Sequence, residues 1–370
     1  MASVDLKSLI DNLVEQVKDS LGMNPSNLVG IDIGLSAIKV AEISGTGKST
    51  TLSAFAIEPL PEGALIEDEV QKPEEIQKAL ERALKKAKII NKNACLSLSG
   101  PNTVAKKLQL AGGSKEEIED QVTWEAEQYL PFNIEESTVA FHIVGKNEGG
   151  GMDIIVGAAR NDVIMNFKAL IEPPMKAKVI DLGILAITNV FELVMGRELE
   201  DTLDSWLLID IGAQFTQFVI YKNKMVMFTK EMNIGGVMIT EEIQRQMGVN
   251  YYEAEDLKIN GDESGNLPEE ILEIIDDVVE SFFAEIKKTI DFYVSSTSDE
   301  SLIGCYITGG GASIPGLIEG LSDLLGLEVH LLNPFDIIKC DTKKVKEDID
   351  IIAYRGLTAI GCALRTVNKK

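Results

Sequence analysis

One phrase occurs twice in this chain, and it constrains the fold more than any other feature of the sequence. Residues 28–34 read LVGIDIG and residues 206–212 read WLLIDIG, so two apolar runs each end in Asp-Ile-Gly. A second apolar segment follows each run, at residues 39–43 and 218–221, which predicts a strand, a tight turn and a returning strand. Because this arrangement repeats, the chain is predicted to contain two copies of one α/β unit.

A glycine-rich segment, GTGKST at residues 45–50, is similar to the phosphate-binding loop of P-loop ATPases. The P-loop pattern also requires a glycine five positions before Gly47, and Glu42 occupies that position. The residues that follow, 51–57, alternate as a strand does, whereas a P-loop leads into a helix. We therefore predict a hairpin turn without a role in nucleotide binding, which the repeat places opposite residues 223–224.

The composition narrows the class of protein. Of the 370 residues 45% are hydrophobic, which is sufficient for a large core and more than one domain. The 59 acidic and 35 basic residues give a net charge of -24, which disfavours binding of nucleic acid or anionic lipid. The four cysteines are scattered, and neither a signal peptide nor a membrane-spanning apolar run is apparent. We expect a cytoplasmic protein with no disulfide framework and no nucleic-acid partner.

The first segment, residues 1–24, carries apolar residues at helical spacing and acidic residues on its other faces. This pattern predicts an amphipathic N-terminal helix outside the main body. Helices that lie on membranes usually have a basic polar face. We therefore expect this helix to pack on the protein itself or on a partner.

Three glycine-bearing strand ends are placed to meet a nucleotide in a cleft between the two units. In the first two, an aspartate can hold magnesium through water, and the following glycine lets the backbone approach phosphate. The third is a run of three glycines, whose backbone can lie against a flat or anionic ligand. The residues expected to contact the nucleotide in these turns are Asp32, Gly34, Leu35, Ser36 and Lys39, then Asp210, Gly212, Ala213, Gln214 and Thr216, then Gly309, Gly310, Gly311 and Ala312.

With these three turns the chain resembles the actin-like ATPase superfamily over about residues 26–366. In that superfamily the two D-x-G turns bind the phosphates and the third glycine run contacts the adenosine. The chain also has Gly235 and Gly236, followed by an A-E-x-x-K segment. By resemblance Gly235 and Gly236 contact the nucleotide, and Glu255 and Lys258 lie near the ribose and adenine. The resemblance implies an α/β fold of two duplicated RNase H-like half-domains around a nucleotide cleft. It also implies ATP and Mg²⁺ as cofactors, with Mg²⁺ held through water by Asp32 and Asp210.

Further segments resemble the type IV pilus assembly protein PilM family, which is related to the cell-division protein FtsA. They are WEAEQYLPF at residues 124–132, FTKE at 228–231, GGGASIPG at 309–316 and NPF at 333–335. This resemblance implies a small inserted subdomain of the FtsA/PilM type, and a groove beside it that receives the cytoplasmic tail of PilN, an inner-membrane pilus protein. It implies a cytoplasmic ATP-binding adaptor in twitching motility, held at the cytoplasmic face of the inner membrane by its pilus and motor partners.

On this basis the chain is expected to divide into an N-terminal helix and four subdomains. Subdomain 1A is expected at residues 25–92, 160–197 and 350–370, subdomain 1C at 93–159, subdomain 2A at 198–235 and 301–349, and subdomain 2B at 236–300. Subdomain 1C should contain strands at 104–110, 138–144 and 153–159 and a helix at 115–129, and one helix at 351–365 should close the chain.

Two departures from the superfamily pattern bear on activity. Leu35 stands where a serine commonly follows the first D-x-G, and the segment at residues 181–185 lacks the glutamate that members often carry, leaving Asp181 as the nearest carboxylate. We therefore expect nucleotide binding with slow ATP hydrolysis or none. A polymerising FtsA-like protein is an alternative, disfavoured because the sequence stops at Lys370 after a domain helix. A small-molecule kinase is a weaker alternative, since it would need the missing base.

Overall fold

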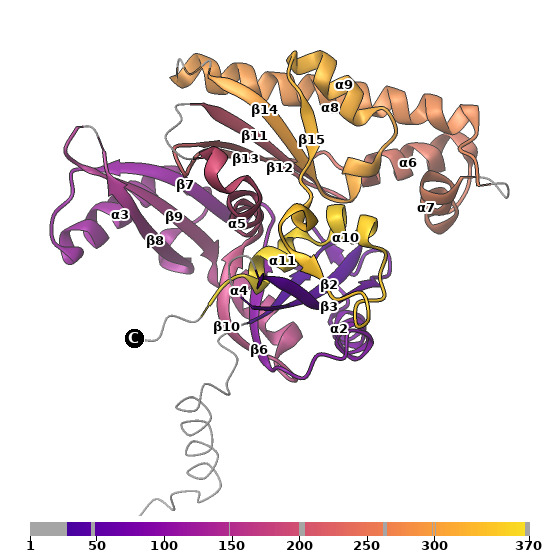
Figure 1. Ribbon diagram of the computed structural model, residues 1–370, viewed down its shortest axis with the longest axis horizontal. Helices are drawn as coiled ribbons and strands as arrows, with labels where there is room; N and C mark the ends of the chain where they lie inside the picture. Colours follow the sequence, from indigo (N-terminus) through magenta and orange to yellow (C-terminus); the bar gives the residue numbers. More distant parts are fainter. Residues whose placement is uncertain are drawn as a thin grey trace, which may run out of the picture.

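The computed structural model describes residues 28–45, 49–147, 149–199, 204–261, 265–297, 299 and 301–366. The predicted helix at residues 1–24 and the centre of the GTGKST turn lie outside these residues. Two large sheets face each other across the middle of the molecule, and a smaller sheet lies beside them (Figure 1). Among the described helices, none is both long and apolar enough to cross a membrane.

The first large sheet is built around the first Asp-Ile-Gly phrase. Its strand order is β10-β6-β1-β2-β3-β16, with β1, β2 and β3 antiparallel and β6 and β10 parallel to β1. Its strands are β1 (Val29–Ile33), β2 (Ala37–Ser44), β3 (Thr51–Pro59), β6 (Asn93–Leu98), β10 (Lys176–Leu182) and β16 (Lys339–Cys340), and a short hairpin of β4 (Leu65–Ile66) and β5 (Glu69–Val70) lies beyond β3.

Helices cover this sheet because most residues of its central strands are apolar and need burial on both faces. Helix α2 (Pro73–Lys86) packs on β2 and β3, and α4 (Asn161–Ile171) packs beside it on β6. Helices α5 (Gly183–Met195) and α11 (Leu357–Ala363) pack on each other and on β6, and α11 also packs on β1. The approach of α11 is close: a Cβ added to Gly30 would lie 1.8 Å from the Ala359 carbonyl oxygen.

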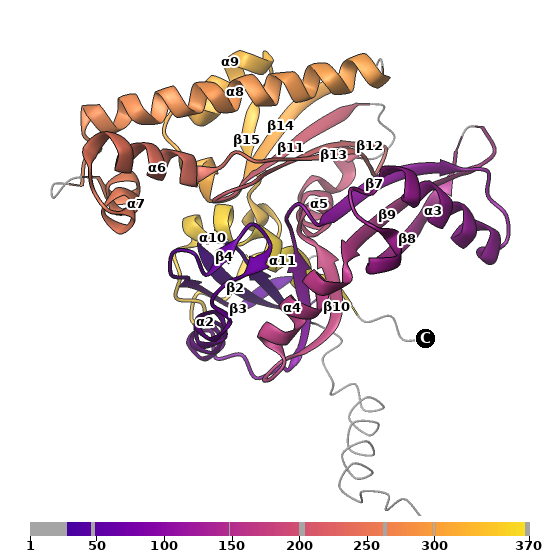
Figure 2. The same cartoon turned by 180° about the vertical axis from the view of Figure 1, so that it is seen from behind.

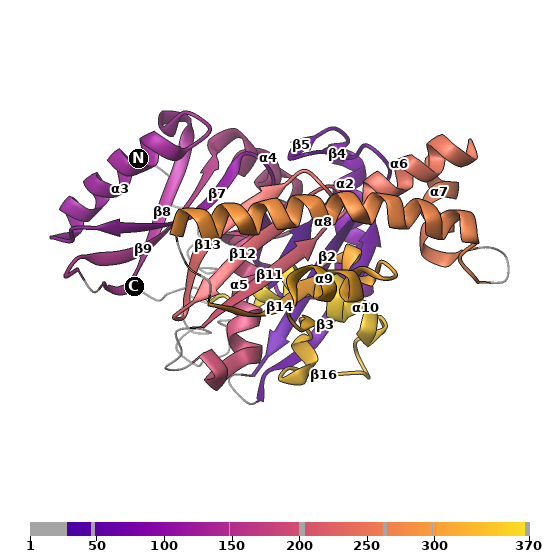
Figure 3. The ribbon, with the colours of Figure 1, turned by 90° about the horizontal axis from the view of Figure 1, so that it is seen from above.

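The second large sheet repeats the arrangement of the first, in the order β13-β12-β11-β14-β15. Its strands are β11 (Ser205–Ile211), β12 (Thr216–Lys222), β13 (Met225–Met232), β14 (Leu302–Thr308) and β15 (Val329–Leu331). Its helices are α6 (Gly236–Met247), α7 (Tyr251–Asn260), α8 (Glu269–Thr297) and α9 (Leu317–Leu325). Seen from above, the long helix α8 runs across the whole sheet (Figure 3). A separate hydrophobic core joins α8 to this sheet.

Strand register confirms the repeat that the sequence predicted. Asp32 pairs with Lys39 across β1 and β2, and Asp210 pairs with Gln217 across β11 and β12. The next connection is a hairpin in both copies, β2 to β3 and β12 to β13. The second hairpin turns at residues 223–224, which both have positive φ, as a two-residue turn requires. GTGKST therefore joins two antiparallel strands, as predicted, and does not lead into a helix.

The small sheet forms a separate unit with its own core, seen at the edge of the molecule in Figure 2. Its strands β7 (Thr103–Leu110), β9 (Met152–Arg160) and β8 (Ser137–Lys146) lie in that order, and α3 (Lys115–Tyr129) covers one face. Ser114 caps α3 with a capping box to Glu117. These elements agree with the predicted ones, but the expected start of the unit at residue 93 is wrong. Strand β6 pairs with β1 and β10 in the first sheet, so the inserted unit begins at β7.

The end of the chain also differs from the prediction. In place of one helix at 351–365 there are two, α10 (Ile349–Arg355) and α11, with Gly356 between them. The Tyr354 carbonyl oxygen, near this break, accepts hydrogen bonds from the Gly309 amide and the Thr308 hydroxyl. The break therefore lets the last part of the chain contact the third glycine turn. Strand β16 likewise pairs with β3 in the first sheet, although residues 301–349 were expected in the second half.

Candidate functional site

A cavity of about 550 Å³ lies between the two large sheets, at the strand ends where both Asp-Ile-Gly phrases finish. All but three of the residues predicted from the sequence line it, so the fold brings together turns that are far apart in the chain. The predicted residues that line it are Asp32, Gly34, Leu35, Ser36, Lys39, Asp210, Gly212, Ala213, Gln214, Gly236, Glu255, Lys258, Gly309, Gly310 and Gly311.

The first turn holds a paired aspartate. Lys39 Nζ lies 3.0 Å from Asp32 Oδ2, because the register of β1 and β2 places these residues opposite each other. Ser97 on β6 donates a hydrogen bond of 3.1 Å to the other oxygen, Oδ1. Both members of the ion pair are mostly buried, with 13% and 14% of the side chains exposed. Lys39 therefore balances the charge of Asp32, and both side chains line the cavity.

The second turn holds an aspartate in a different electrostatic state. Burial, and secondly the negative charge of Asp32, raise the pKa of Asp210 to about 7. Both carboxylates line the same cavity. The turn itself is tight, since the Gly212 amide donates to the Phe215 carbonyl at 2.9 Å, and a Cβ on Gly212 would lie 2.8 Å from that oxygen. A cation bound near Asp210 would lower its pKa again.

The third turn contains glycines for two different reasons. Gly309 has φ +88°, and a Cβ there would lie 2.3 Å from the Ile211 carbonyl oxygen. A Cβ on Gly311 would lie 2.2 Å from Ile211 Cγ2. For Gly310 the nearest atom to an added Cβ is Arg355 Nε, 4.0 Å away. Two glycines therefore let the turn pack on the end of β11, and Gly310 leaves space in the cavity.

Helix α7 supplies an ion pair at the cavity wall. Lys258 Nζ lies 2.6 Å from Glu255 Oε2, 2.7 Å from Thr240 Oγ1 and 3.1 Å from the Gly236 carbonyl oxygen. These contacts fasten α7 to the start of α6. Burial lowers the pKa of Lys258, partly opposed by the Glu255 carboxylate. Both residues of the A-E-x-x-K segment thus form a helix-surface ion pair and line the cavity at once.

Three predicted residues do not line the cavity. The Thr216 side chain is fully buried and its hydroxyl donates to the Ile234 carbonyl at 2.8 Å, so it is not available to a ligand as expected. A Cβ on Gly235 would lie 2.6 Å from the Ala213 carbonyl oxygen, which places this glycine behind the second turn. Ala312 is buried in the core of the second half. Their roles are to shape the turns.

Asp181, the carboxylate in the segment at residues 181–185, has a structural role. Asp181 is buried, and Arg365 near the end of the described chain forms an ion pair with it. Its second oxygen accepts a hydrogen bond of 2.9 Å from the Leu182 amide. Asp181 is therefore occupied by internal partners and does not line the cavity.

Several residues that line the cavity were not predicted, among them Ser99, Gln217, Tyr251 and Arg355. Gln217 follows Asp210 at the same distance in sequence as Lys39 follows Asp32, so alignment of the two repeats could have identified it. Its side-chain oxygen is buried and has no hydrogen-bond partner among the described residues. Arg355 lies on α10, and no motif in the sequence marks it.

The donors in the cavity fit a magnesium-bound polyphosphate. The two aspartates, Lys39 and Arg355 combine cation-binding and anion-binding groups around glycine turns whose amides can approach phosphate. Within the described residues, no group of three or more His, Cys, Asp or Glu side chains could hold a metal ion. A magnesium ion would accordingly need oxygens from water and from a ligand, as magnesium in phosphate sites commonly has.

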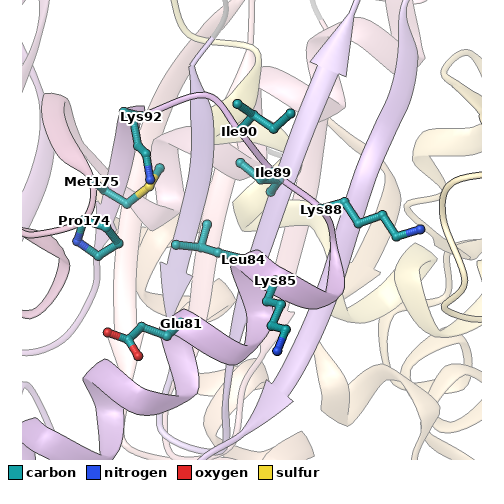
Figure 4. A pocket seen from close by; sticks show the side chains of 9 residues that line it. All are labelled: Glu81, Leu84, Lys85, Lys88, Ile89, Ile90, Lys92, Pro174 and Met175. Atoms are coloured by element: carbon teal, nitrogen blue, oxygen red, sulfur yellow. The ribbon is translucent and has the colours of Figure 1, made fainter.

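A second cavity, of about 400 Å³, lies away from the cleft at the end of α2 (Figure 4). It is a shallow surface site with apolar residues between lysines, and Ile90 is 86% exposed beside it. It shares no lining residue with the large cavity. Its lining residues are Glu81, Leu84, Lys85, Lys88, Ile89, Ile90, Lys92, Pro174 and Met175.

Comparison with known proteins gives a consistent result. The family model described as type IV pilus assembly protein PilM matches residues 30–367. A solved structure, the PilM-PilN type IV pilus biogenesis complex, is 27% identical, covers 93% of this chain and 99% of that chain, and has a TM-score of 0.81. The ethanolamine utilization protein EutJ from Carboxydothermus hydrogenoformans is similar in fold, with 15% identity, 92% and 90% coverage and a TM-score of 0.54.

A curated relative is the cell division protein FtsA of Enterococcus hirae, 27% identical over 150 residues. The match covers 35% of this chain and 33% of FtsA, so it spans only about a third of that protein. These similarities confirm the predicted actin-like ATPase fold and its relation to FtsA.

Proposed function

This chain belongs to the type IV pilus assembly protein PilM family, and on that premise we propose that it is an ATP-binding adaptor of the pilus assembly complex. Its partner would be the cytoplasmic tail of a PilN-like inner-membrane protein, which would hold it at the cytoplasmic face of the inner membrane. The PilM of the similar solved structure is in a complex with PilN. In this chain the bound nucleotide would set the closure of the cleft and thereby the binding of envelope and motor partners.

The convergence of the two Asp-Ile-Gly turns and the third glycine turn on one cavity supports ATP as the ligand. Amides of the first two turns would bind phosphate oxygens, with Lys39 as the cation beside them. Gly310 would leave room for the adenosine, and Glu255 and Lys258 would contact the ribose and adenine. Asp32 and Asp210 would hold Mg²⁺ through water, and the ion would neutralise phosphate charge.

We propose that ATP hydrolysis is slow or absent. A general base has to lie within hydrogen-bond reach of the attacking water. Asp181 is paired with Arg365, and Glu231 accepts hydrogen bonds from the Gly100 amide and the Gln217 side chain. Neither carboxylate lines the cavity. Of the carboxylates that do, Asp32 and Glu255 form ion pairs with Lys39 and Lys258, and Asp210 would face the proposed Mg²⁺. The bound nucleotide would therefore act as a regulator of shape.

Isothermal titration calorimetry with Mg·ATP tests the nucleotide site. The wild type should bind, and Asp210→Ala and Gly310→Val should each lower the affinity by at least about tenfold, roughly 1.4 kcal/mol. Gly145→Val on β8 is the matched control, because a Cβ there meets no atom within 4 Å and the residue is outside the cavity. Equal binding by all four proteins, or no binding by the wild type, would refute the site.

Co-purification with a PilN-like protein, with and without its cytoplasmic tail, tests the partner. Binding should require the tail. A second variant would delete residues 103–160, because the Arg160 amide lies 3.1 Å from the Asn102 carbonyl oxygen and the ends can be rejoined. If the groove is beside the inserted unit, this variant should keep Mg·ATP binding and lose PilN. Unchanged PilN binding by the deletion variant would contradict that placement.

A further inference from the structure

The inserted unit contacts both halves of the molecule, and one contact is made by two sheet edges. Strand β13 is the edge of the second large sheet, β7 is the edge of the small sheet, and the two lie against each other (Figure 2). Alternate residues of a strand point to the same side. On β13, Thr229 and Glu231 share one side, and the Thr229 hydroxyl donates to the Ala105 carbonyl oxygen. Met227, at an irregularity in the strand register, has its sulfur 3.6 Å from Lys107 Nζ.

Glu231 reaches the loop that leads from the first sheet into β7. The Gly100 amide donates a hydrogen bond of 3.2 Å to Glu231 Oε2. On its other side the loop is held by the first half, since the Asn102 amide and side chain donate to the two oxygens of Asp68 at 3.1 and 2.9 Å. Asp68 is 2% exposed. The loop at residues 99–102 is therefore fixed to both halves at once.

The backbone of this loop leaves little freedom. Gly100 has φ +121°, a region that side-chain-bearing residues rarely adopt, and an added Cβ would lie 2.9 Å from Asp68 Cβ. The preceding residue, Ser99, lines the large cavity. A relative movement of the two halves would have to move this loop or break one of its hydrogen bonds.

Glu231 is also linked to the cavity through one side chain. In the strand register Asp210, Gln217 and Glu231 are directly opposite one another on β11, β12 and β13. Gln217 Nε2 lies 3.3 Å from Glu231 Oε2, and because a carboxylate only accepts, this contact orients the amide nitrogen toward Glu231. The amide oxygen, which lacks a partner among the described residues, is then left for a donor in the cavity. Water around a bound metal or phosphate is such a donor.

We infer that β13 and the 99–102 loop form a joint that transmits occupancy of the cleft to the inserted unit. Gln217 binds water of the bound ligand, Glu231 connects it to the Gly100 amide, and Thr229 connects the same strand to β7. The inference rests on the proposed nucleotide binding and adds the route by which the nucleotide reaches the partner-binding subdomain. In this coupling the ligand changes the free-energy difference between two arrangements of the contact that β13 makes with β7 and the 99–102 loop.

Hydrogen–deuterium exchange on the full chain, with and without Mg²⁺ and a non-hydrolysable ATP analogue, tests the joint. In the wild type the ligand should slow exchange of the peptides covering residues 100–110 by about fivefold or more, the low end of typical allosteric coupling. It should also slow exchange of residues 212–214 and 309–311, which report on the cavity.

Thr229→Val removes the hydroxyl that bonds to β7 and changes nothing in the cavity. It should keep the affinity for the analogue and the protection of the cavity turns, and lose the response at residues 100–110. Thr138→Val is the matched control, because it removes a hydroxyl within the inserted unit that bonds to Asn161 at 2.7 Å, away from β13. This control should respond as the wild type does. Glu231→Gln should reduce the response at the Gly100 peptide.

The outcomes separate this inference from the proposed function. If calorimetry detects no binding of the analogue, both fail. If the analogue binds and protects the cavity turns while residues 100–110 do not respond, the joint is refuted and nucleotide binding stands. A Thr229→Val protein that keeps the full response would also refute the joint.

Discussion

The three glycines of the third turn should respond differently to one added methyl group. Gly309→Ala combines a positive φ with a Cβ 2.3 Å from the Ile211 carbonyl oxygen. Strain of about 1–3 kcal/mol for the backbone and a similar amount for overpacking predict a loss of about 2–6 kcal/mol in the free energy of unfolding. Gly311→Ala, whose Cβ would meet the Ile211 side chain, should lose about 1–3 kcal/mol. Gly310→Ala should stay within about 0.5 kcal/mol of the wild type.

Urea unfolding of the proteins without nucleotide, followed by circular dichroism, measures these differences. Calorimetry with Mg·ATP on the folded variants then separates stability from binding. Gly310→Val should remain folded and lose affinity, because the longer side chain enters the cavity, whereas Gly310→Ala should bind nearly as the wild type does. If all three alanine variants lost the same stability, or if Gly310→Val unfolded the protein, the assignment of separate roles to these glycines would be wrong.

Three further predictions follow from other contacts. Because the pKa of Asp210 is raised to about 7, the native state binds a proton that the unfolded state releases near pH 4, so the stability of the nucleotide-free protein should fall between about pH 4 and 7. Asp210→Asn should remove this fall and, in EDTA, be more stable at pH 8 by about 1–3 kcal/mol; a pH-independent difference would contradict the mechanism. Asp181→Asn should instead destabilise the protein by about 1–3 kcal/mol, measured by urea unfolding, since it weakens the buried ion pair with Arg365. Lys48→Ala should leave the affinity for Mg·ATP unchanged in calorimetry, and a tenfold loss would show that the GTGKST turn has a role in binding.

Local patterns were sufficient for most of the fold. The apolar run, the aspartate and the glycine recur at fixed spacing in both halves, and such periodicity is set by the chain itself. The helix at Lys115–Tyr129 agrees with the prediction to the residue, and in the structure Ser114 caps its start. The GTGKST segment was correctly assigned to a hairpin, since the alternation after it is that of a strand.

The same patterns also identified most of the cavity. Aspartates at strand ends and glycine turns are local signals; together with the resemblance to the actin-like ATPase superfamily they gave eighteen predicted site residues, of which fifteen line one cavity. The three exceptions depend on tertiary contacts, and Thr216 is an example. Thr216 has the right spacing, but its hydroxyl donates to the Ile234 carbonyl oxygen, in the segment between β13 and α6. A sequence shows which groups can donate a hydrogen bond and does not show which of them already have an acceptor inside the protein.

Tertiary structure decided where the units divide and how they meet. Strand β6 looked like the start of the inserted unit, and only its pairing with β1 and β10 places it in the first sheet. The contact of Thr229 with Ala105, and that of Glu231 with Gly100, join segments more than a hundred residues apart. The sequence thus determined the repeated unit and the aspartates and glycines of its turns, because both depend on residues close together in the chain. The joint between cleft and inserted unit depends on how two sheet edges pack, and only the folded structure fixes that.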